Sequence, residues 1–219
     1  MQKIVYVNYA SAYNLFQEGD VLLFRGNKLY SKFIKAGTAS PYTHVGVASR
    51  PNGLWEIVFF HGRTGGATQN IAHVSMCEGP FIDVYRPTSH QDRSYFIPQT
   101  GEVYSFSTPF NGKAVTNIMR KMTGLPYGWR RIWWIFKYKL FLRNFLFSHN
   151  DFILDDEVKD IVYPICSSTV AYAFNRYGID LIKNKGDNWT TPADIALSPN
   201  LNYLFTIKFN PETDKKFLK

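Results

Sequence analysis

Cysteine is scarce in this 219-residue sequence, which contains only Cys77 and Cys166. Two cysteines that share no CxxC spacing exclude a disulfide framework and argue against a structural zinc site. A single disulfide between the two has no positive support in the sequence. We therefore expect a protein that needs neither a metal nor another cofactor.

Long apolar runs are also missing. The sequence begins MQKI, and no apolar run near this start is long enough for a signal peptide. We expect a cytoplasmic protein that folds in a reducing compartment, with attachment to a membrane surface as an open alternative.

No internal repeat and no recognisable nucleic-acid module is present, so we expect no specific nucleic-acid partner. The sequence does not indicate an oligomeric state.

Composition is that of a globular chain with a surplus of aromatic residues. Hydrophobic residues make up 45% and charged residues 19%, which permits a buried core and argues against disorder. Aromatic residues make up 17%, which indicates a broad aromatic core or an apolar binding surface. The net charge of +8 favours an anionic partner, such as anionic lipid or a cell-wall polymer, although ordinary solubility explains it equally well.

Strand patterns predominate early in the chain and helix patterns late, which predicts an α+β protein. Residues 1–18 read as a loosely structured lead-in. Turn chemistry at 51–53 joins two of the strands into a hairpin, and Gly124 and Gly178 end two of the helices. Strands are expected at 21–24, 42–48, 54–60, 81–85, 103–106 and 204–209, and helices at 28–36, 111–123, 166–177 and from 192 onward.

Cys166 is the stronger candidate nucleophile of the two cysteines. It stands at the predicted start of a helix, where the helix dipole and free N–H groups lower a thiol pKa and can bind an oxyanion. Cys77 lies in a loop-like stretch, 75–79, that has no helix start. The alternative for both residues is a buried structural thiol, since free cysteine is among the most buried residue types.

Among the histidines, His44 is the best candidate for a general base. It lies inside a predicted strand, where packing would hold its ring. Glu56 lies on the neighbouring strand of the hairpin and could accept a hydrogen bond from the second ring nitrogen. The alternatives are that His44 is an ordinary capped or surface histidine and that Glu56 faces solvent. The competing histidines are His61, His73, His90 and His149.

The order of these motifs resembles a known group of enzymes. The segments at 19–26, 43–48 and 165–170, together with Glu56, resemble the permuted branch of the NlpC-type papain-like superfamily. This branch contains the YiiX/YaeF-like amidases, which are relatives of the lecithin:retinol acyltransferase-like proteins. Further matching segments occur at 122–127, which resembles a G-x-P-Y motif, at 175–181 and at 191–196. The resemblance spans roughly residues 18–207.

This resemblance implies a fold, a reaction and a set of roles. The fold would be one circularly permuted papain-like domain over residues 1–219, with an antiparallel sheet or small barrel packed against helices. Cys166, at a helix N-terminus, would be the nucleophile, His44 the base, Glu56 the orienting residue and Tyr127 an auxiliary group. The implied reaction is that of a cysteine peptidase or amidase, acting on a peptide such as a cell-wall peptide through a thioacyl intermediate. The alternatives are a lipid-directed thiol esterase or acyltransferase, and a catalytically silent binding module.

An insertion at about 128–160 departs from the family pattern. Its first part, 130–147, reads RRIWWIFKYKLFLRNFLF, which is too short and too charged to span a bilayer. Lys137, Lys139 and Arg143 do not gather on one helical face. One interpretation is a helix packed on the domain, and the other is a lid or lipid-facing segment anchored by Trp133 and Trp134.

Overall fold

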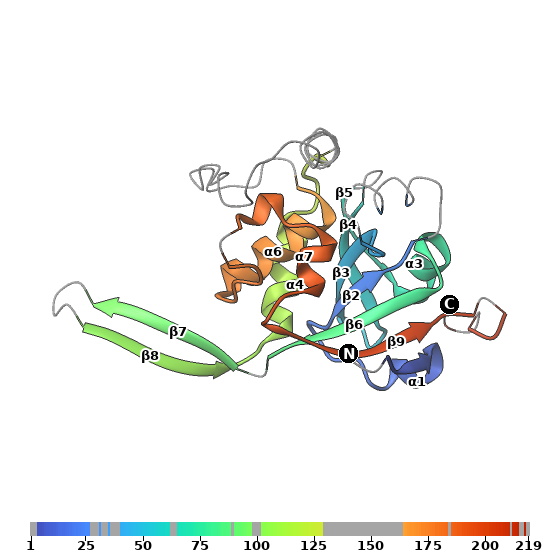
Figure 1. Ribbon diagram of the computed structural model, residues 1–219, viewed down its shortest axis with the longest axis horizontal. Helices are drawn as coiled ribbons and strands as arrows, with labels where there is room; N and C mark the ends of the chain where they lie inside the picture. The colour runs from blue at the N-terminus through green and yellow to red at the C-terminus, as the bar shows by residue number, and fades with distance from the viewer. Residues whose placement is uncertain are drawn as a thin grey trace, which may run out of the picture.

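The central feature of the fold is a seven-stranded sheet, seen here in a computed structural model (Figure 1). The structure describes residues 4–26, 31, 35, 40–61, 65–88, 90–97, 102–128, 164–183, 185–210, 212–214 and 217. The strands of this sheet are β1 (Tyr6–Asn8), β2 (Val21–Phe24), β3 (His44–Ser49), β4 (Glu56–His61), β5 (Gly65–Asn70), β6 (Phe81–Pro87) and β9 (Leu201–Lys208). The helices are α1 (Tyr9–Tyr13), α3 (Ile71–Glu78), α4 (Gly112–Lys121), α6 (Cys166–Tyr177), the 3-10 turn η1 (Asp187–Trp189) and α7 (Pro192–Ala196).

The sheet is open and almost wholly antiparallel. Its strand order is β1-β9-β6-β2-β3-β4-β5, and only the β1–β9 pair is parallel. The expected α+β class and antiparallel core are therefore confirmed. The small-barrel alternative is wrong for the residues that the structure describes, because β1 and β5 form two separate edges.

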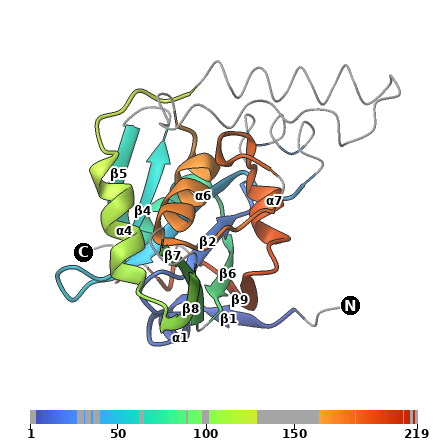
Figure 2. The same cartoon turned by 90° about the vertical axis from the view of Figure 1, so that its left-hand side faces the viewer.

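Helices cover both faces of this sheet because alternate residues of a strand point to opposite sides. On one face, Leu22 and Phe24 pack in a cluster with residues of α1 and α3. On the other face, Val21 and Leu23 pack in a cluster with residues of α4, α6 and α7. Figure 1 shows α3 on one side of the strands and α4, α6 and α7 on the other, and Figure 2 looks toward the latter group. We call these the α3 face and the α6 face.

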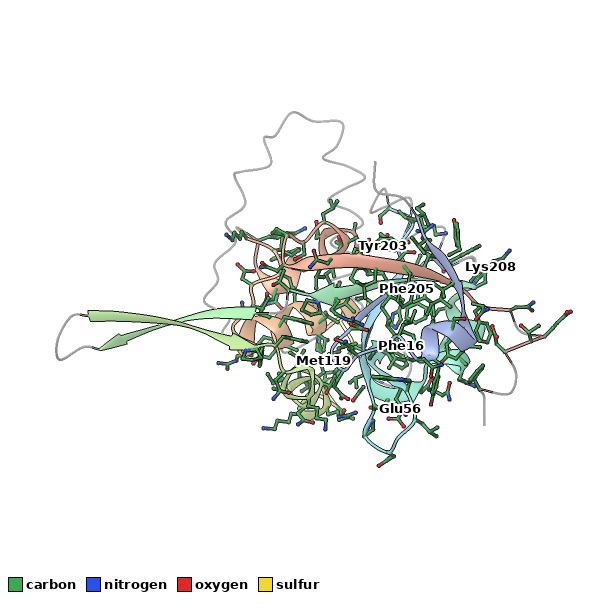
Figure 3. The ribbon with its side chains drawn as sticks, turned by 90° about the horizontal axis from the view of Figure 1, so that it is seen from below. Phe16, Glu56, Met119, Tyr203, Phe205 and Lys208 are labelled. Atoms are coloured by element: carbon green, nitrogen blue, oxygen red, sulfur yellow. The ribbon has the colours of Figure 1, made fainter. Side chains whose placement is uncertain are left out.

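A β-bulge in the pairing of β6 with β9 changes the face of the sheet on which the side chains of β9 pack. The register of β6 with β9 shifts between Val84 and Tyr85. As a result Tyr203 packs toward the α6 face while Phe205, two residues later, belongs to the cluster of the α3 face (Figure 3). A bulge adds one residue to one strand, which reverses the side to which the residues beyond it point.

Two further strands form a separate hairpin. β7 (His90–Ile97) and β8 (Glu102–Pro109) pair with each other and project from the body of the domain (Figure 1). The sequence predicted part of β8 but not β7. His90, expected in a polar loop, is the first residue of β7.

The predicted elements recur with two corrections. The strands at 21–24, 42–48, 54–60, 81–85 and 204–209 and the helices after 111, 166 and 191 are confirmed. The prediction of a loosely structured lead-in is wrong, because residues 6–13 form β1 and α1. The Asn8 side chain caps α1 by accepting the Ser11 N–H at 2.8 Å. The loop predicted around Cys77 is also wrong, because this residue lies in α3. Asn70 caps the start of that helix.

The insertion and most of the helix expected at 28–36 lie outside the described residues. The flanks of the insertion are described, and the Gly128 N–H donates a hydrogen bond to the Pro164 carbonyl at 2.9 Å. The two residues on either side of the segment outside the description therefore lie next to each other. Among the helices that the structure describes, we find none with the length and apolar character needed to cross a membrane.

Candidate active site

The site begins at the N-terminus of α6, where the sequence Cys-Ser-Ser-Thr is completely buried in the domain. The Ser168 hydroxyl accepts the Ile165 N–H at 2.8 Å, and the Ser167 hydroxyl donates to the Thr190 carbonyl at 2.6 Å. The Thr169 hydroxyl donates to the Ile165 carbonyl at 2.9 Å. These bonds satisfy buried hydroxyls and hold the first turn in place, so the position of Cys166 is defined.

Cys166 is a free thiol with 6% of its surface exposed, and three hydrogen-bond donors act on its sulfur. The backbone N–H groups of Val45, on β3, and of Ser167 both bond to this sulfur. The hydroxyl of Tyr127 bonds to it as well. Donors from three separate segments of the chain therefore converge on one sulfur atom.

Burial controls the ionisation of this thiol. It raises the pKa of Cys166 from 9.0 to about 11, against the opposing effect of the Val45 and Ser167 N–H groups and of Tyr127. The Glu78 carboxylate raises the pKa of this thiol further. The expectation of a depressed thiol pKa at the helix start is therefore wrong for this structure. Loss of hydration outweighs the helix start, and the resting thiol is protonated near neutral pH.

Tyr127 lies where the resemblance implied, beside Cys166. Its hydroxyl oxygen accepts the Cys166 N–H and its O–H donates to the sulfur, and burial raises the pKa of the phenol well above 10. The ring packs on a small cluster that contains Phe60 and Met122. The insertion does not displace Tyr127, because the bond between Gly128 and Pro164 closes it one residue further on.

His44 is the first residue of β3 and only 5% exposed. Its ring lies 5.3 Å from that of Phe59 in an edge-on contact and 5.9 Å from that of Phe24, centroid to centroid. The next residue, Val45, provides the N–H that bonds to Cys166. One peptide unit therefore separates His44 from the residue that contacts the thiol. The His44 ring packs on the α3 face, whereas Val45 and Cys166 belong to the core cluster of the α6 face, so the two groups can meet only around the end of β3, where His44 is the first residue.

Glu56 is not close to His44, so its predicted orienting role is wrong. Glu56 pairs with Ser49, at the end of β3 opposite to His44. Five residues of strand separate these two positions, which corresponds to about 16 Å. Figure 3 shows Glu56 next to the turn that joins β3 and β4. In an antiparallel hairpin, residues that are close to the turn on one strand cannot meet the far end of the other.

Two further residues lie at the His44 end: His61, which the sequence offered only as a competing base, and Glu78, which sequence reasoning missed. The register that pairs Gly46 with Phe59 brings His61 to this end of β4. Glu78, the last residue of α3, is buried and raises the pKa of both Cys166 and Tyr127. The signal for Glu78 was an acidic residue inside an otherwise apolar stretch, but the stretch was interpreted as a loop.

The site therefore belongs to an α+β domain in which a helix begins at a buried cysteine and packs against a strand that begins at a histidine. No protein-family model matches the chain, and no curated protein matches its sequence. Among solved structures, the fold is similar to that of the metalloprotein YiiX from Escherichia coli O157:H7. The TM-score is 0.55 and the identity 12%, and the match covers 86% of this chain and 96% of the YiiX chain.

Because YiiX is a metalloprotein, a metal site is the first possibility that its fold raises for this chain. Across the part of the chain that the structure describes, no three His, Cys, Asp or Glu residues lie close enough together to hold a metal ion. The described residues thus do not fit a metal ion.

Proposed function

We propose that this protein is a cysteine-dependent hydrolase of the permuted papain-like type, with Cys166 as nucleophile, His44 as general base and Tyr127 as auxiliary donor. The observation that carries the proposal is the convergence on the Cys166 sulfur at the start of α6. The Val45 N–H, the Ser167 N–H and the Tyr127 hydroxyl all bond to it. A buried cysteine that only fills space needs no such set of donors.

The protonated thiol defines how the reaction starts. Because the pKa of Cys166 is about 11, the sulfur must lose its proton as it attacks, and not before. The proton passes to a ring nitrogen of His44 while the sulfur forms a bond to the substrate carbonyl carbon. The carbonyl electron pair moves to oxygen, which becomes an oxyanion. His44 then returns the proton to the leaving amine, and the C–N bond breaks to give a thioacyl enzyme.

The donors around the sulfur serve the next stage. Once Cys166 has formed its bond to carbon, the N–H groups at the start of α6 and the Tyr127 hydroxyl become available to the oxyanion. Water, activated by His44, hydrolyses the thioacyl bond and restores the thiol. The donors thus change partner from sulfur to oxygen during the reaction.

The proposed substrate is a peptide amide, with cell-wall peptides as the preferred class. This choice rests on the resemblance to the YiiX/YaeF-like amidases and on the fold shared with YiiX. Transfer of the acyl group from a lipid ester is the alternative implied by the related acyltransferases. The same thioacyl intermediate would form in either reaction, so the intermediate is tested first and the substrate second.

The test uses the whole chain and a simple acyl donor, p-nitrophenyl acetate. Intact-protein mass spectrometry followed by peptide mapping should find one acetyl group, on Cys166, and Cys166→Ser should not form the thioester. His44→Ala should slow the acylation about 100- to 10,000-fold, which is the usual contribution of a general base. Acylation at the wild-type rate in His44→Ala would overturn the proposal. Peptidoglycan fragments and phospholipids, each assayed by product mass, then separate the two substrate classes.

A further inference from the structure

Glu78 is a buried carboxylate close to the reacting groups. It is the last residue of α3 and 5% exposed. The chain turns immediately after it at Gly79, whose φ of 145° is a conformation that side chains rarely adopt. A buried carboxylate is costly unless a cation or hydrogen-bond donors stabilise it, so a residue of this type at this place requires a structural or functional reason.

The His44 ring and α3 lie on the same face of the sheet. The ring packs against Phe24 and Phe59, and both of these belong to the core cluster that α3 joins through Ile71, Ala72 and Val74. β3 begins at His44 and α3 ends at Glu78, so these two residues can be neighbours only if the start of β3 lies beside the end of α3.

The surroundings of Gly26 show that the start of β3 and the end of α3 lie side by side. A methyl group at Gly26 would collide with the Thr43 hydroxyl and would lie 3.1 Å from the Glu78 carbonyl oxygen. Thr43 precedes His44 directly, and its hydroxyl accepts the Gly26 N–H at 2.9 Å. Glu78 and the start of β3 therefore meet around one glycine, whose small size permits the approach.

The carboxylate is also in electrostatic contact with the rest of the site. Its charge raises the pKa of Cys166 and that of Tyr127. Because Coulomb interactions weaken with distance and with hydration, this effect places Glu78 near both groups inside the buried region. Glu56, the residue first predicted to assist His44, lies at the opposite end of the sheet.

We propose that Glu78 is the positioning residue for His44: its carboxylate stabilises the imidazolium that forms when His44 takes the Cys166 proton. The inference rests on the proposed function. At rest the carboxylate opposes ionisation of the thiol and so keeps the proton on sulfur. When the proton moves to His44, the same negative charge faces a cation, and the transfer becomes more favourable. Glu78 acts on the ion pair electrostatically and takes no part in the proton transfer itself.

The experiment measures the rate of Cys166 acylation by p-nitrophenyl acetate between pH 5 and 9. Glu78→Gln keeps the shape of the side chain and removes its charge, Glu78→Asp keeps the charge, and Glu56→Gln is the matched control. Glu78→Gln should lower the rate about 10- to 100-fold and move the acidic limb of the profile about one unit lower. Glu78→Asp should recover much of this loss, and Glu56→Gln should stay within about twofold of the wild type. Neither Cys166 nor Tyr127 accounts for a limb near neutral pH, because burial raises the pKa values of both out of this range.

A wild-type rate and profile in Glu78→Gln would overturn the inference. So would a full effect in His61→Gln together with none in Glu78→Gln, because β4 would then supply the positioning residue. If His44→Ala leaves acylation unchanged, the proposed function fails, whereas dependence on His44 without dependence on Glu78 rejects only this inference. Should Glu78→Gln not fold, NMR titration of His44 in Cys166→Ala protein gives the answer. Adding Glu78→Asn, which also removes the charge, should lower the imidazole pKa, and an unchanged value would overturn the inference.

Discussion

The backbone N–H of Val45 bonds to the sulfur of Cys166 and so joins the start of β3 to the start of α6. The two residues are 121 positions apart in the sequence. Val45 belongs to the same core cluster as Cys166, and its predecessor is His44. The bond therefore fixes the distance between the strand that carries the candidate base and the helix that carries the candidate nucleophile.

The buried thiol should make the protein sensitive to alkaline pH. The folded protein holds the Cys166 proton more tightly than the unfolded chain, since the pKa is raised from 9.0 to about 11. The contribution of this thiol to the free energy of unfolding is fully present below pH 9 and is lost as the pH rises toward 11. The loss is about 3 kcal/mol for a difference of two pKa units. Urea unfolding of the wild type and of Cys166→Ala between pH 8 and 11 measures this loss, because groups that do not interact with Cys166 cancel in the comparison. Parallel pH dependences would contradict the assigned burial of the thiol.

Tyr127 should contribute its hydroxyl to the reaction and little to stability. Tyr127→Phe removes the O–H that bonds to the sulfur while it keeps the ring that packs on Phe60. We expect the acylation rate to fall about 10- to 100-fold, with the melting temperature changed by only a few degrees. The control is Tyr172→Phe, because Tyr172 packs against the same cluster but its hydroxyl accepts a bond from Arg176. Equal effects of the two substitutions would mean that the Tyr127 hydroxyl has no specific role.

Asp83 should be the most costly single carboxylate to remove. Only 1% of its side chain is exposed, and it accepts bonds from Arg25, Tyr42 and Thr206 at 2.6 to 2.9 Å. Asp83→Ala leaves a guanidinium and two hydroxyls without their acceptor, so we expect a loss of about 3 to 5 kcal/mol in the free energy of unfolding. Lys185→Ala, at the more exposed pair with Asp194, should cost less than about 1 kcal/mol. Chemical denaturation of both variants tests the difference, and similar losses would show that burial of Asp83 is unimportant.

The local patterns of the sequence predicted most of the secondary structure. Turn residues at 51–53 and the alternation on either side predicted the β3–β4 hairpin, and Gly178 predicted the end of α6, where it adopts a φ of 103°. These signals depend on neighbours along the chain. β1 and α1 were missed because they are short, and β1 is stabilised by parallel pairing with β9, some 200 residues later. β7 was missed because its polar sequence resembles a loop.

The site was predicted unevenly for the same reason. Cys166 was identified from a helix start, His44 from a strand, and Tyr127 from a resemblance, and all three are signals that a linear sequence contains. Glu56 was chosen because it lies on the neighbouring strand. Adjacent strands, however, bring together only residues in register, and register is counted from the turn. Glu78 could not have been found in this way, since a helix was not expected there.

What the sequence determined by itself was the identity of the chemical groups and the local backbone around each: a cysteine at a helix start, a histidine at a strand and a capped helix after Thr191. Only the tertiary structure decided which groups meet and in what ionisation state. The pKa of Cys166 depends on how much water the packed domain excludes and on donors from Val45 and Tyr127. Burial and long-range contacts are properties of the whole packed chain, so no window of neighbouring residues contains them.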